Sequence, residues 1–429
     1  MRTSYILTID NTEWYKKQLL GWAQQFREIV FLDSNDYHQQ YTSYDAVLAV
    51  DAFTSIKTDY HNAFEELKVY QQTTKDWLFG YLSYDLKNDT EELTSNNFDG
   101  LGFPDLFFFQ PKKMFLLKGN ELELQYLNMC DDEIEEDINS ILNYKLGDSG
   151  ISSPINIQQR ISKEDYIVKA NDMLAHIHRG DIYEANFCME FYAENANINP
   201  FDTYQRLNAI SEPPFAVFFR NYKQYLLSAS PERYIRKEND KIISQPIKGT
   251  ARRSMDEAED KRIQEELYNN EKERSENIMI VDLVRNDLSR TAAKGSVEVE
   301  ELCGTYAFKQ VHHLISTVTS RLAEGYSPVD VIKTAFPMGS MTGAPKISAM
   351  NIIEKIEETK RGVYSGAVGY FTPEGNFDFN VVIRSILYSQ LNNYVSFSVG
   401  SAITSKAIPE TEYEECLLKA RAMRSVLES

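Results

Sequence analysis

The sequence has few cysteines, and this limits the chemistry available to it. Its four cysteines, Cys130, Cys188, Cys303 and Cys416, are far apart, with no CxxC pair and no matching histidine spacing. Zinc sites and disulfide frameworks require closer clusters of ligands or of paired cysteines. We therefore expect buried, reduced thiols and neither a structural zinc ion nor a disulfide framework.

Positive charge is also scarce. Lysine and arginine number 45 against 64 aspartates and glutamates, which gives a net charge of −19 spread along 429 residues. Such a field repels nucleic acids and anionic membrane surfaces, so neither is expected as a partner. An acidic substrate would need a local cluster of cations or a metal ion.

Long apolar runs are absent as well. No cationic segment followed by an apolar core opens the sequence, and no apolar stretch approaches the length that spans a membrane. The sequence therefore predicts a soluble, cytoplasmic protein.

The order of apolar runs and turns predicts an α+β fold, with large mixed β-sheets covered by helices on the outside. Residues 1 to about 140 alternate short apolar runs with polar turns, without strict βαβ alternation. A stretch rich in glycine, serine and proline follows at 144–157. We place a boundary there, between an N-terminal α+β subdomain (1–150) and a catalytic domain (151–429).

Several helices are expected in the second part of the chain: one after Ser162, a charged helical region from Asp256 to about Leu288, and others at 312–322, 329–336, 347–358 and about 410–427. The first begins with Ser162 as N-cap and ends at Gly180. The helix predicted from His312 to Leu322 would carry His313. This histidine is a candidate acid or base, although a lone histidine beside leucine is more often structural.

Lys248 is the residue on which the predicted chemistry centres. The runs 224–229 and 241–247 are rich in β-branched and aromatic residues and predict two neighbouring strands, which places Lys248 at a strand end. Taken alone, this residue is more typical of an ordinary solvated lysine.

Two acid pairs stand at helical i, i+3 spacing: Glu273 with Glu276, and Glu412 with Glu415. This spacing puts each pair on one helix face, where a cation would offset the repulsion. Mg²⁺ prefers such hard oxygen ligands. Solvated helix faces in an acid-rich chain give the same pattern, but the apolar run that follows Glu276 favours an inward-pointing carboxylate.

A glycine-rich loop at 336–346 (FPMGSMTGAPK) runs into a predicted helix, and free N–H groups at a helix start bind anions. The loop lacks the spacing of a Walker A motif, and a simple tight turn is the alternative. Arg384 and Lys419 are candidates for charge-assisted bonds to carboxylates, or else surface cations.

Together these features resemble the chorismate-utilising enzymes, a family that includes anthranilate synthase component I, aminodeoxychorismate synthase component I, and the isochorismate and salicylate synthases. The matching motifs occur in the family's order across residues 160–429. They are SPER (230–233), PIKGT (246–250), ENIMIVDLVRND (276–287), HHL (312–314), GSMTGAPK (339–346), YSGAVG (364–369), IRS (383–385) and EYEE (412–415).

The branch is indicated by the residue between Ile247 and Gly249. At this position anthranilate synthases have a segment that resembles PIAGT. One branch of the aminodeoxychorismate synthases carries PIKGT, as this sequence does. The resemblance thus implies conversion of chorismate and ammonia to 4-amino-4-deoxychorismate, for 4-aminobenzoate and folate. The alternatives are an anthranilate or isochorismate synthase in which Lys248 has another role, and a non-catalytic subunit that binds chorismate.

The resemblance also implies roles for single residues. Glu276 and Glu415 would ligate Mg²⁺, with Glu273 and Glu412 beside them. The residues expected to hold the substrate are Thr342, Gly343, Tyr364, Arg384, Gly400 and Lys419.

Lys248 would be kept neutral by burial and nearby cations and would attack C2 of chorismate. Glu232 would act as general acid for the departing C4 hydroxyl, and ammonia would then add at C4 and expel the lysine. His313 would lie near the reacting face of the ring.

The sequence departs from the family pattern at two places. Gly400-Ser401-Ala402 stands where many relatives have Gly-Ala-Gly, and the segment nearest to the tryptophan pocket of some relatives is Leu32-Asp33-Ser34. The chain also lacks an amidotransferase nucleophile. The family therefore implies a separate glutamine amidotransferase subunit as the ammonia source, and a pyridoxal-phosphate lyase that completes the product.

Overall fold

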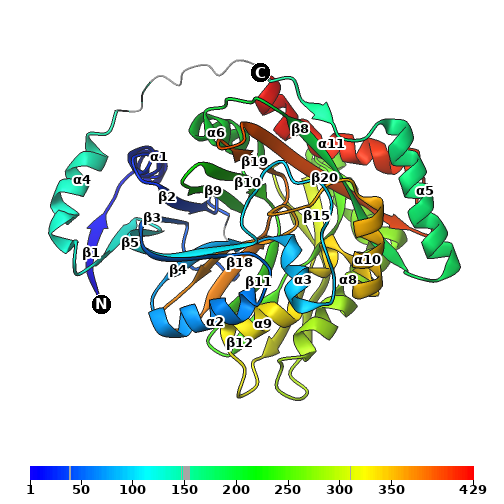
Figure 1. The fold of residues 1–429 in the computed structure, drawn as a ribbon, viewed down its shortest axis with the longest axis horizontal. Helices are drawn as coiled ribbons and strands as arrows, with labels where there is room; N and C mark the ends of the chain where they lie inside the picture. Colours follow the sequence, from blue (N-terminus) through cyan, green and yellow to red (C-terminus); the bar gives the residue numbers. More distant parts are fainter. Residues whose placement is uncertain (38–39, 146, 148–154, 310) are drawn as a thin grey trace.

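The computed structural model describes the whole chain except residues 38–39, 146, 148–154 and 310. In this part of the chain, twenty strands and eleven α-helices form an α+β fold (Figure 1), so the expected fold class is confirmed. Every ladder between the named strands is antiparallel.

A first sheet runs in the order β16-β8-β20-β19-β10-β9-β2-β3-β5-β6-β1, with β7 also paired to β8. Its strands are β1 (Arg2–Thr8), β2 (Glu28–Asp33), β3 (Ala46–Thr58), β5 (Leu106–Lys118), β6 (Glu121–Leu127), β7 (Gln158–Gln159), β8 (Glu184–Ala193), β9 (Phe215–Asn221), β10 (Gln224–Ser230), β16 (Gly343–Ala344), β19 (Ser385–Ser389) and β20 (Tyr394–Thr404).

A second sheet branches from β5 and runs in the order β4-β17-β18-β11-β12-β15, with β13 and β14 also paired to β15. Its strands are β4 (Leu78–Leu82), β11 (Arg233–Glu238), β12 (Lys241–Ser244), β13 (Ile247–Arg252), β14 (Glu298–Ala307), β15 (Val311–Arg321), β17 (Ala367–Phe371) and β18 (Phe377–Val381).

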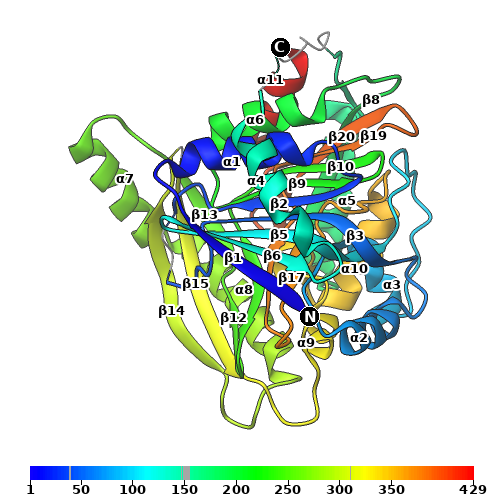
Figure 2. The same cartoon turned by 90° about the vertical axis from the view of Figure 1, so that its left-hand side faces the viewer.

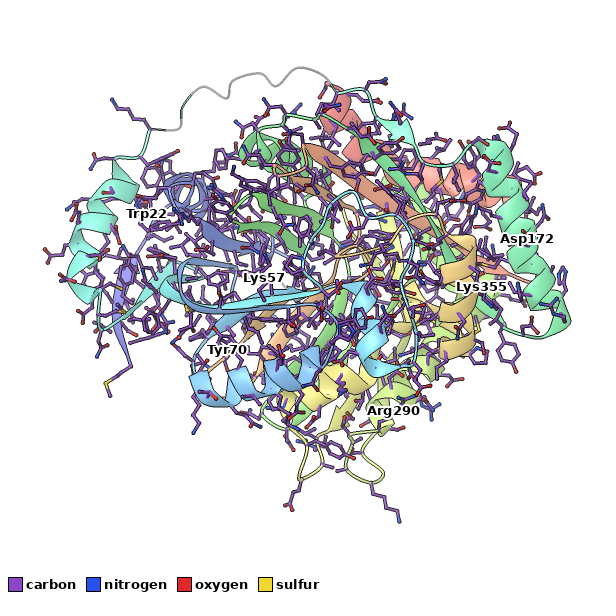
Figure 3. All side chains as sticks on the ribbon, viewed as in Figure 1. Trp22, Lys57, Tyr70, Asp172, Arg290 and Lys355 are labelled. Carbon is purple, nitrogen blue, oxygen red and sulfur yellow. The ribbon has the colours of Figure 1, made fainter. Side chains whose placement is uncertain are left out.

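Two large apolar cores hold these layers together. One includes residues of both sheets, such as Val47 of β3 and Phe379 of β18. The other lies between the first sheet and a group of helices, and Trp22 of α1 is buried in it (Figure 3). These helices are α1 (Thr12–Ala23), α4 (Ile134–Leu142), α5 (Lys163–Arg179), α6 (Pro200–Ser211), α10 (Lys346–Ile356) and α11 (Pro409–Glu428).

The remaining helices lie around the second sheet. Both α2 (Ala63–Thr74) and α9 (Pro328–Ala335) lie low in Figure 1, while α7 (Glu257–Asn269) is at the edge near β13 in Figure 2. The longest of this group is α8 (Glu271–Ser289), and α3 (Lys87–Thr90) is a single turn. Short 3₁₀ turns are η1 (Tyr84–Leu86), η2 (Asp131–Glu133) and η3 (Gly339–Met341).

Two local predictions are wrong. The segment predicted as a helix from His312 to Leu322 is strand β15, which is buried on both faces between other strands and therefore shows no alternation of apolar and polar residues. The strands at 224–230 and 241–244 are not neighbours, because β10 pairs with β9 and β19, whereas β12 pairs with β11 and β15.

The expected boundary at 150/151 falls outside the described residues. Strands on either side of it share ladders, since β2 pairs with β9 and β4 pairs with β17. None of the helices in the described part of the chain has the length and apolar character needed to cross a membrane.

Candidate active site

The backbone at Lys248 is fixed against helix α8. Asn277 of α8 donates from Nδ2 to the carbonyl oxygens of Lys248 (3.2 Å) and Leu314 (3.3 Å). The next residue, Gly249, has φ +100°, and a Cβ added there would lie 3.2 Å from Glu273 Oε2. Only glycine adopts this backbone without strain and lets the acidic face of α8 approach so closely.

The Lys248 amine lies among carboxylates. Its Nζ is 3.9 Å from Glu276 Oε2 and 4.0 Å from Glu184 Oε2. Burial by itself would lower the pKa of Lys248, but the charges of Glu184, Glu276, Glu415 and Glu273 outweigh it and raise this pKa above its ordinary value. The expectation of a neutral lysine among cations is therefore wrong for this arrangement, because the neighbours are acids.

The two predicted acid pairs lie on α8 and α11, and Glu415 of α11 is near enough to α8 for its charge to act on Glu273. Burial, with the charges of Glu276 and Glu415, raises the pKa of Glu273, and burial with the charge of Glu415 raises the pKa of Glu412. The effect of Glu415 on Glu273 links the two helices. Lys419 Nζ lies 2.7 Å from Glu415 Oε1 and offsets part of this repulsion.

The acid pairs suit a hard divalent cation. Among the described residues, no three histidine, cysteine or acidic side chains converge tightly enough to form a complete metal site by themselves. Mg²⁺, however, usually takes one or two carboxylates and completes its shell with water and substrate oxygens. The carboxylates of α8 and α11 are oxygen donors of this kind. Burial raises the pKa of Glu273 and Glu412, whereas, despite burial, the charge of Lys419 and its bond to Glu415 lower the pKa of Glu415.

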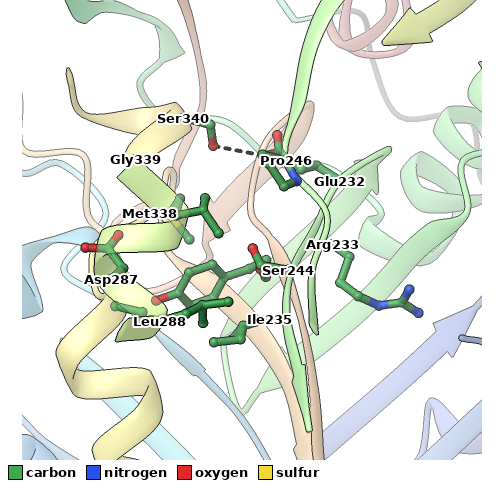
Figure 4. A pocket seen from close by; sticks show the side chains of 13 residues that line it. Glu232, Arg233, Ile235, Ser244, Pro246, Asp287, Leu288, Met338, Gly339 and Ser340 are labelled. Carbon is green, nitrogen blue, oxygen red and sulfur yellow. Dashed lines mark hydrogen bonds between the residues drawn. The ribbon is translucent and has the colours of Figure 1, made fainter. Parts of the chain in front are cut away.

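Glu232 lies in the turn between β10 and β11 and is only 5% exposed. Its Oε1 accepts a hydrogen bond of 2.8 Å from Ser340 Oγ, shown in Figure 4. Burial raises the pKa of Glu232 to about 7, although the Ser340 bond, the N–H of Ile247 and the charge of Lys248 oppose the rise. A carboxyl group with this pKa can donate and accept a proton near neutrality.

Arg384 supplies a positive charge beside Glu232. Its φ is +50°, in the left-handed region that non-glycine residues seldom adopt. Burial lowers the pKa of Arg384, against the effect of Glu232. Within the described residues its guanidinium has no hydrogen-bond or ion-pair partner, so it is available to a carboxylate.

His313 is buried on β15. Its Nδ1 lies 3.0 Å from Thr250 Oγ1, and its Nε2 has no partner among the described residues. Burial lowers the pKa of His313 to about 3, aided by the charges of Arg384 and Lys419. The imidazole is therefore neutral at physiological pH and is poorly suited to act as a general acid.

The glycine-rich loop passes through η3 and β16 before α10. Thr342 uses its own polar groups within this turn, since its N–H donates to Gly339 O (3.1 Å) and its Oγ1 donates to Met338 O (3.2 Å). A Cβ added to Gly343 would lie 2.2 Å from Glu184 O. The loop is thus held tightly against the first residue of β8.

The other expected substrate-binding residues have partners inside the protein. Tyr364 is buried, and its hydroxyl oxygen accepts from Cys188 Sγ at 3.8 Å. A Cβ added to Gly400 would lie 2.7 Å from the same sulfur. Lys419 donates to Gly400 O (2.8 Å) in addition to its pairing with Glu415. Their roles in holding a substrate stay predictions.

Sequence reasoning missed Glu184 and Asn277, and it gave no role to Ser340. Glu184 opens β8, whose run EANFCMEFYA is a strand signal with an acid at its first position. Asn277 follows the expected ligand Glu276, and an amide just before an apolar run was a readable sign of a buried polar contact.

This arrangement agrees with the comparisons with known proteins. Residues 19–425 match the family model described as chorismate binding enzyme. The chain is a member of the chorismate-binding enzymes.

Relatives among the chorismate-binding enzymes are named for different activities. The chain is 35% identical over 357 residues to an anthranilate synthase component I-like protein of Synechocystis, covering 82% of this chain and 72% of that one. It is 38% identical over 271 residues to aminodeoxychorismate synthase component 1 of Escherichia coli, and the match covers 63% of this chain and 59% of that one.

Solved structures of similar fold include anthranilate synthase component I from Streptococcus pneumoniae. It has a TM-score of 0.79 at 24% identity and covers 91% of this chain and 95% of that one. The isochorismate synthase MenF of Escherichia coli gives a TM-score of 0.80 at 16% identity and covers 100% and 95%. At these sequence identities the structural similarity shows only that the fold is shared.

A cavity borders the segment Leu32-Asp33-Ser34. Its volume is about 70 Å³, and it is also lined by Arg233 and Asp378. Asp33 pairs with Lys16 at 3.0 Å, and Arg233 pairs with Asp378 at 3.0 Å, so the charged lining groups have partners inside the protein. A bound tryptophan stays an untested expectation.

Proposed function

We propose that this protein is an aminodeoxychorismate synthase component I, which converts chorismate and ammonia to 4-amino-4-deoxychorismate through a covalent adduct of Lys248. The observation that carries the proposal is the position of Lys248 between the acid pairs and Glu232. The Lys248 amine is within 4 Å of Glu276, and the N–H of the preceding Ile247 donates to the Glu232 carboxylate.

The proposed reaction begins with Lys248 Nζ in its deprotonated form. Nζ forms a bond to C2, the ring double bond shifts, and the C4–O bond breaks as Glu232 protonates the departing hydroxyl, which leaves as water. Ammonia then bonds to C4, the double bond returns, and the C2–Nζ bond breaks. Glu232 takes back the proton that the new C4 amine loses. The pKa of Glu232, about 7, suits both transfers.

The remaining charged residues would position the substrate. Arg384, which has no partner of its own among the described residues, would pair with one carboxylate of chorismate. Glu276 and Glu415 would hold Mg²⁺, with Glu273 and Glu412 beside them. The bound ion would anchor the ring carboxylate and stabilise developing negative charge.

The raised pKa of Lys248 requires that substrate or metal binding change its surroundings before attack. Chorismate and Mg²⁺ together would bring charges that engage the surrounding carboxylates. Amine attack then becomes possible at mildly alkaline pH.

The proposal extends to partners and pathway. Ammonia would come from a separate glutamine amidotransferase subunit, and a pyridoxal-phosphate lyase would convert the product to 4-aminobenzoate for folate. The name of the Escherichia coli relative, aminodeoxychorismate synthase component 1, supports the existence of a second component, and both partners are what the family resemblance implies. A cytoplasmic location is part of the same proposal.

The test is to incubate the purified chain with chorismate, Mg²⁺ and ammonium at mildly alkaline pH and identify the product by chromatography with mass detection. A peak of 4-amino-4-deoxychorismate, which an added lyase converts to 4-aminobenzoate, supports the proposal. Anthranilate or isochorismate would contradict it and leave the family membership intact.

Anthranilate synthase activity is the second candidate. The observation that favours it is the 35% identity to an anthranilate synthase component I-like protein over most of the chain. In that case ammonia would attack C2 directly, and Lys248 would have another role. The product assay above separates the two activities.

A further inference from the structure

Glu184 is a buried acid at the proposed active site with no assigned role. It is the first residue of β8 and is 3% exposed. Its Oε2 has no hydrogen-bond partner among the described residues. Buried carboxylate oxygens are normally bonded, because leaving one without a partner is costly. An unpaired oxygen at this position therefore calls for an explanation in terms of function.

The only cation that approaches Glu184 in the described structure is Lys248. The distance from Glu184 Oε2 to Lys248 Nζ is 4.0 Å, which is within ion-pair range but beyond hydrogen-bond length. The two charges thus attract each other while the amine stays free to move toward a substrate. A tighter hydrogen bond would hold the amine back.

The backbone of Glu184 is fixed on two sides. Glu184 pairs with Ala344 in the ladder between β8 and β16. Its carbonyl oxygen lies where a side chain on Gly343 would be, so loop and strand are in direct contact. The carboxylate consequently projects from a rigid strand, which is the kind of support that a precisely oriented group requires.

Glu276 is the other carboxylate near the Lys248 amine, at 3.9 Å. On the proposed function, Glu276 belongs to the metal-binding set, and a bound divalent cation would repel the Lys248 ammonium. Glu184 is not part of that set. It would therefore remain the negative charge that keeps the lysine side chain in the site.

We infer that Glu184 is the positioning residue for Lys248: its ion pair with the Lys248 ammonium holds this side chain in the site until the amine loses its proton and attacks. The inference rests on the proposed function. It names a residue whose charge acts through the lysine and not on the substrate.

The experiment compares Glu184→Gln with a matched control on the same strand, Glu190→Gln. Glu190 is also buried on β8, but it is bonded to Tyr394 (2.9 Å) and paired with Arg160 (3.1 Å), away from Lys248. The rate of adduct formation is measured from the intact mass of the protein after addition of chorismate and Mg²⁺ without ammonia. Steady-state turnover is measured with ammonium, and Tm is measured for each variant.

For Glu184→Gln we expect adduct formation and kcat to fall about tenfold or more, with KM for chorismate changed less than about twofold. Glu184→Asp, which keeps the charge, should recover part of the loss. Glu190→Gln should lower Tm and leave the adduct rate near that of the wild type. Normal adduct formation in Glu184→Gln would overturn the inference.

A double-mutant cycle distinguishes positioning from a general effect on the structure. If Glu184 acts through the lysine, adding Glu184→Gln to Lys248→Ala should cause little further loss of the residual activity. If the double variant instead loses activity by the product of the two single losses, the inference is overturned, even if both single variants are slow. Absence of any lysine adduct in the wild type, or full activity of Lys248→Ala, would instead refute the covalent step of the proposed function.

Discussion

Ser340 Oγ donates a hydrogen bond of 2.8 Å to Glu232 Oε1, and this bond joins the glycine-rich loop to the turn between β10 and β11. The two residues are 108 positions apart in the chain, yet both line a cavity of about 20 Å³. The bond favours the ionised form of Glu232 and therefore lowers the pKa of this proposed general acid.

The first prediction concerns the pH dependence of catalysis. A general acid works in its protonated form and the Lys248 amine attacks in its deprotonated form, so kcat with bound chorismate and Mg²⁺ should follow a bell-shaped pH profile. On its alkaline limb kcat should fall as Glu232, with a pKa of about 7, loses its proton. Ser340→Ala removes a bond that lowers this pKa. The alkaline limb should therefore move to higher pH, which a profile between about pH 5 and 9 detects.

Ser244→Ala is the matched control for that profile. Ser244 lines the same cavity, but its Oγ donates to the carbonyl oxygen of Tyr234 (2.8 Å) and not to Glu232. The alkaline limb of the Ser244→Ala pH profile should stay at the same pH as in the wild type. A Ser340→Ala profile that coincides with the wild type would show that Glu232 is not the group that titrates.

The second prediction concerns the two lysines near Glu276. Lys248 and Lys272 both lie 3.9 Å from this carboxylate, but only Lys248 is largely buried. Lys248→Ala should reduce formation of 4-amino-4-deoxychorismate by more than about a thousandfold, since it removes the nucleophile. Lys272→Ala should change it less than about threefold, because exposed ion pairs contribute little. Similar losses in the two variants would point to charge near Glu276 and not to covalent catalysis.

The third prediction concerns the metal. If Glu415 helps to hold Mg²⁺, the ion should raise the Tm of the wild type, because a ligand that binds only the folded state stabilises it. Glu415→Gln should remove most of this rise, and a chelator should reverse it in the wild type. Glu414→Gln is the control, since the adjacent Glu414 points to Lys163 (2.8 Å). An equal rise in both variants would exclude Glu415 as a ligand.

Local sequence signals predicted those parts of the fold that depend on local chemistry. The helix expected from Ser162 to Gly180 is present as α5, with Ser162 Oγ accepting from the N–H of Asp165 and Gly180 in the left-handed conformation. Capping and termination involve residues a few positions apart, so a short window of sequence contains them. The alternation of short runs and turns likewise predicted the α+β class.

Local sequence signals could not predict contacts between segments that are far apart in the chain. Strand β15 pairs with three other strands, and its buried run of His, Leu, Ile, Ser, Thr and Val residues has no period of two, so helix and strand were indistinguishable. The acids around Lys248 come from β8, α8 and α11, which are far apart in the chain. The sequence indicated each acid pair but not the sum of their charges at one amine, which is why its pKa direction was predicted wrongly.

The last prediction concerns Gly249, where backbone conformation and close packing coincide. Alanine at φ +100° is strained and should cost about 1 kcal/mol or more of stability. At Gly249 its Cβ would also lie 3.0 Å from Leu314 Cδ1 and 3.2 Å from Glu273 Oε2, so α8 would have to move. Gly295 offers the control, because its φ is +76° but nothing lies within 4 Å of an added Cβ. We expect Gly295→Ala to lower Tm with unchanged kcat, and Gly249→Ala to lower both Tm and kcat, since the acid pair and Lys248 would separate. Equal kcat in the two variants would show that the approach of α8 to this glycine does not determine the geometry of the site.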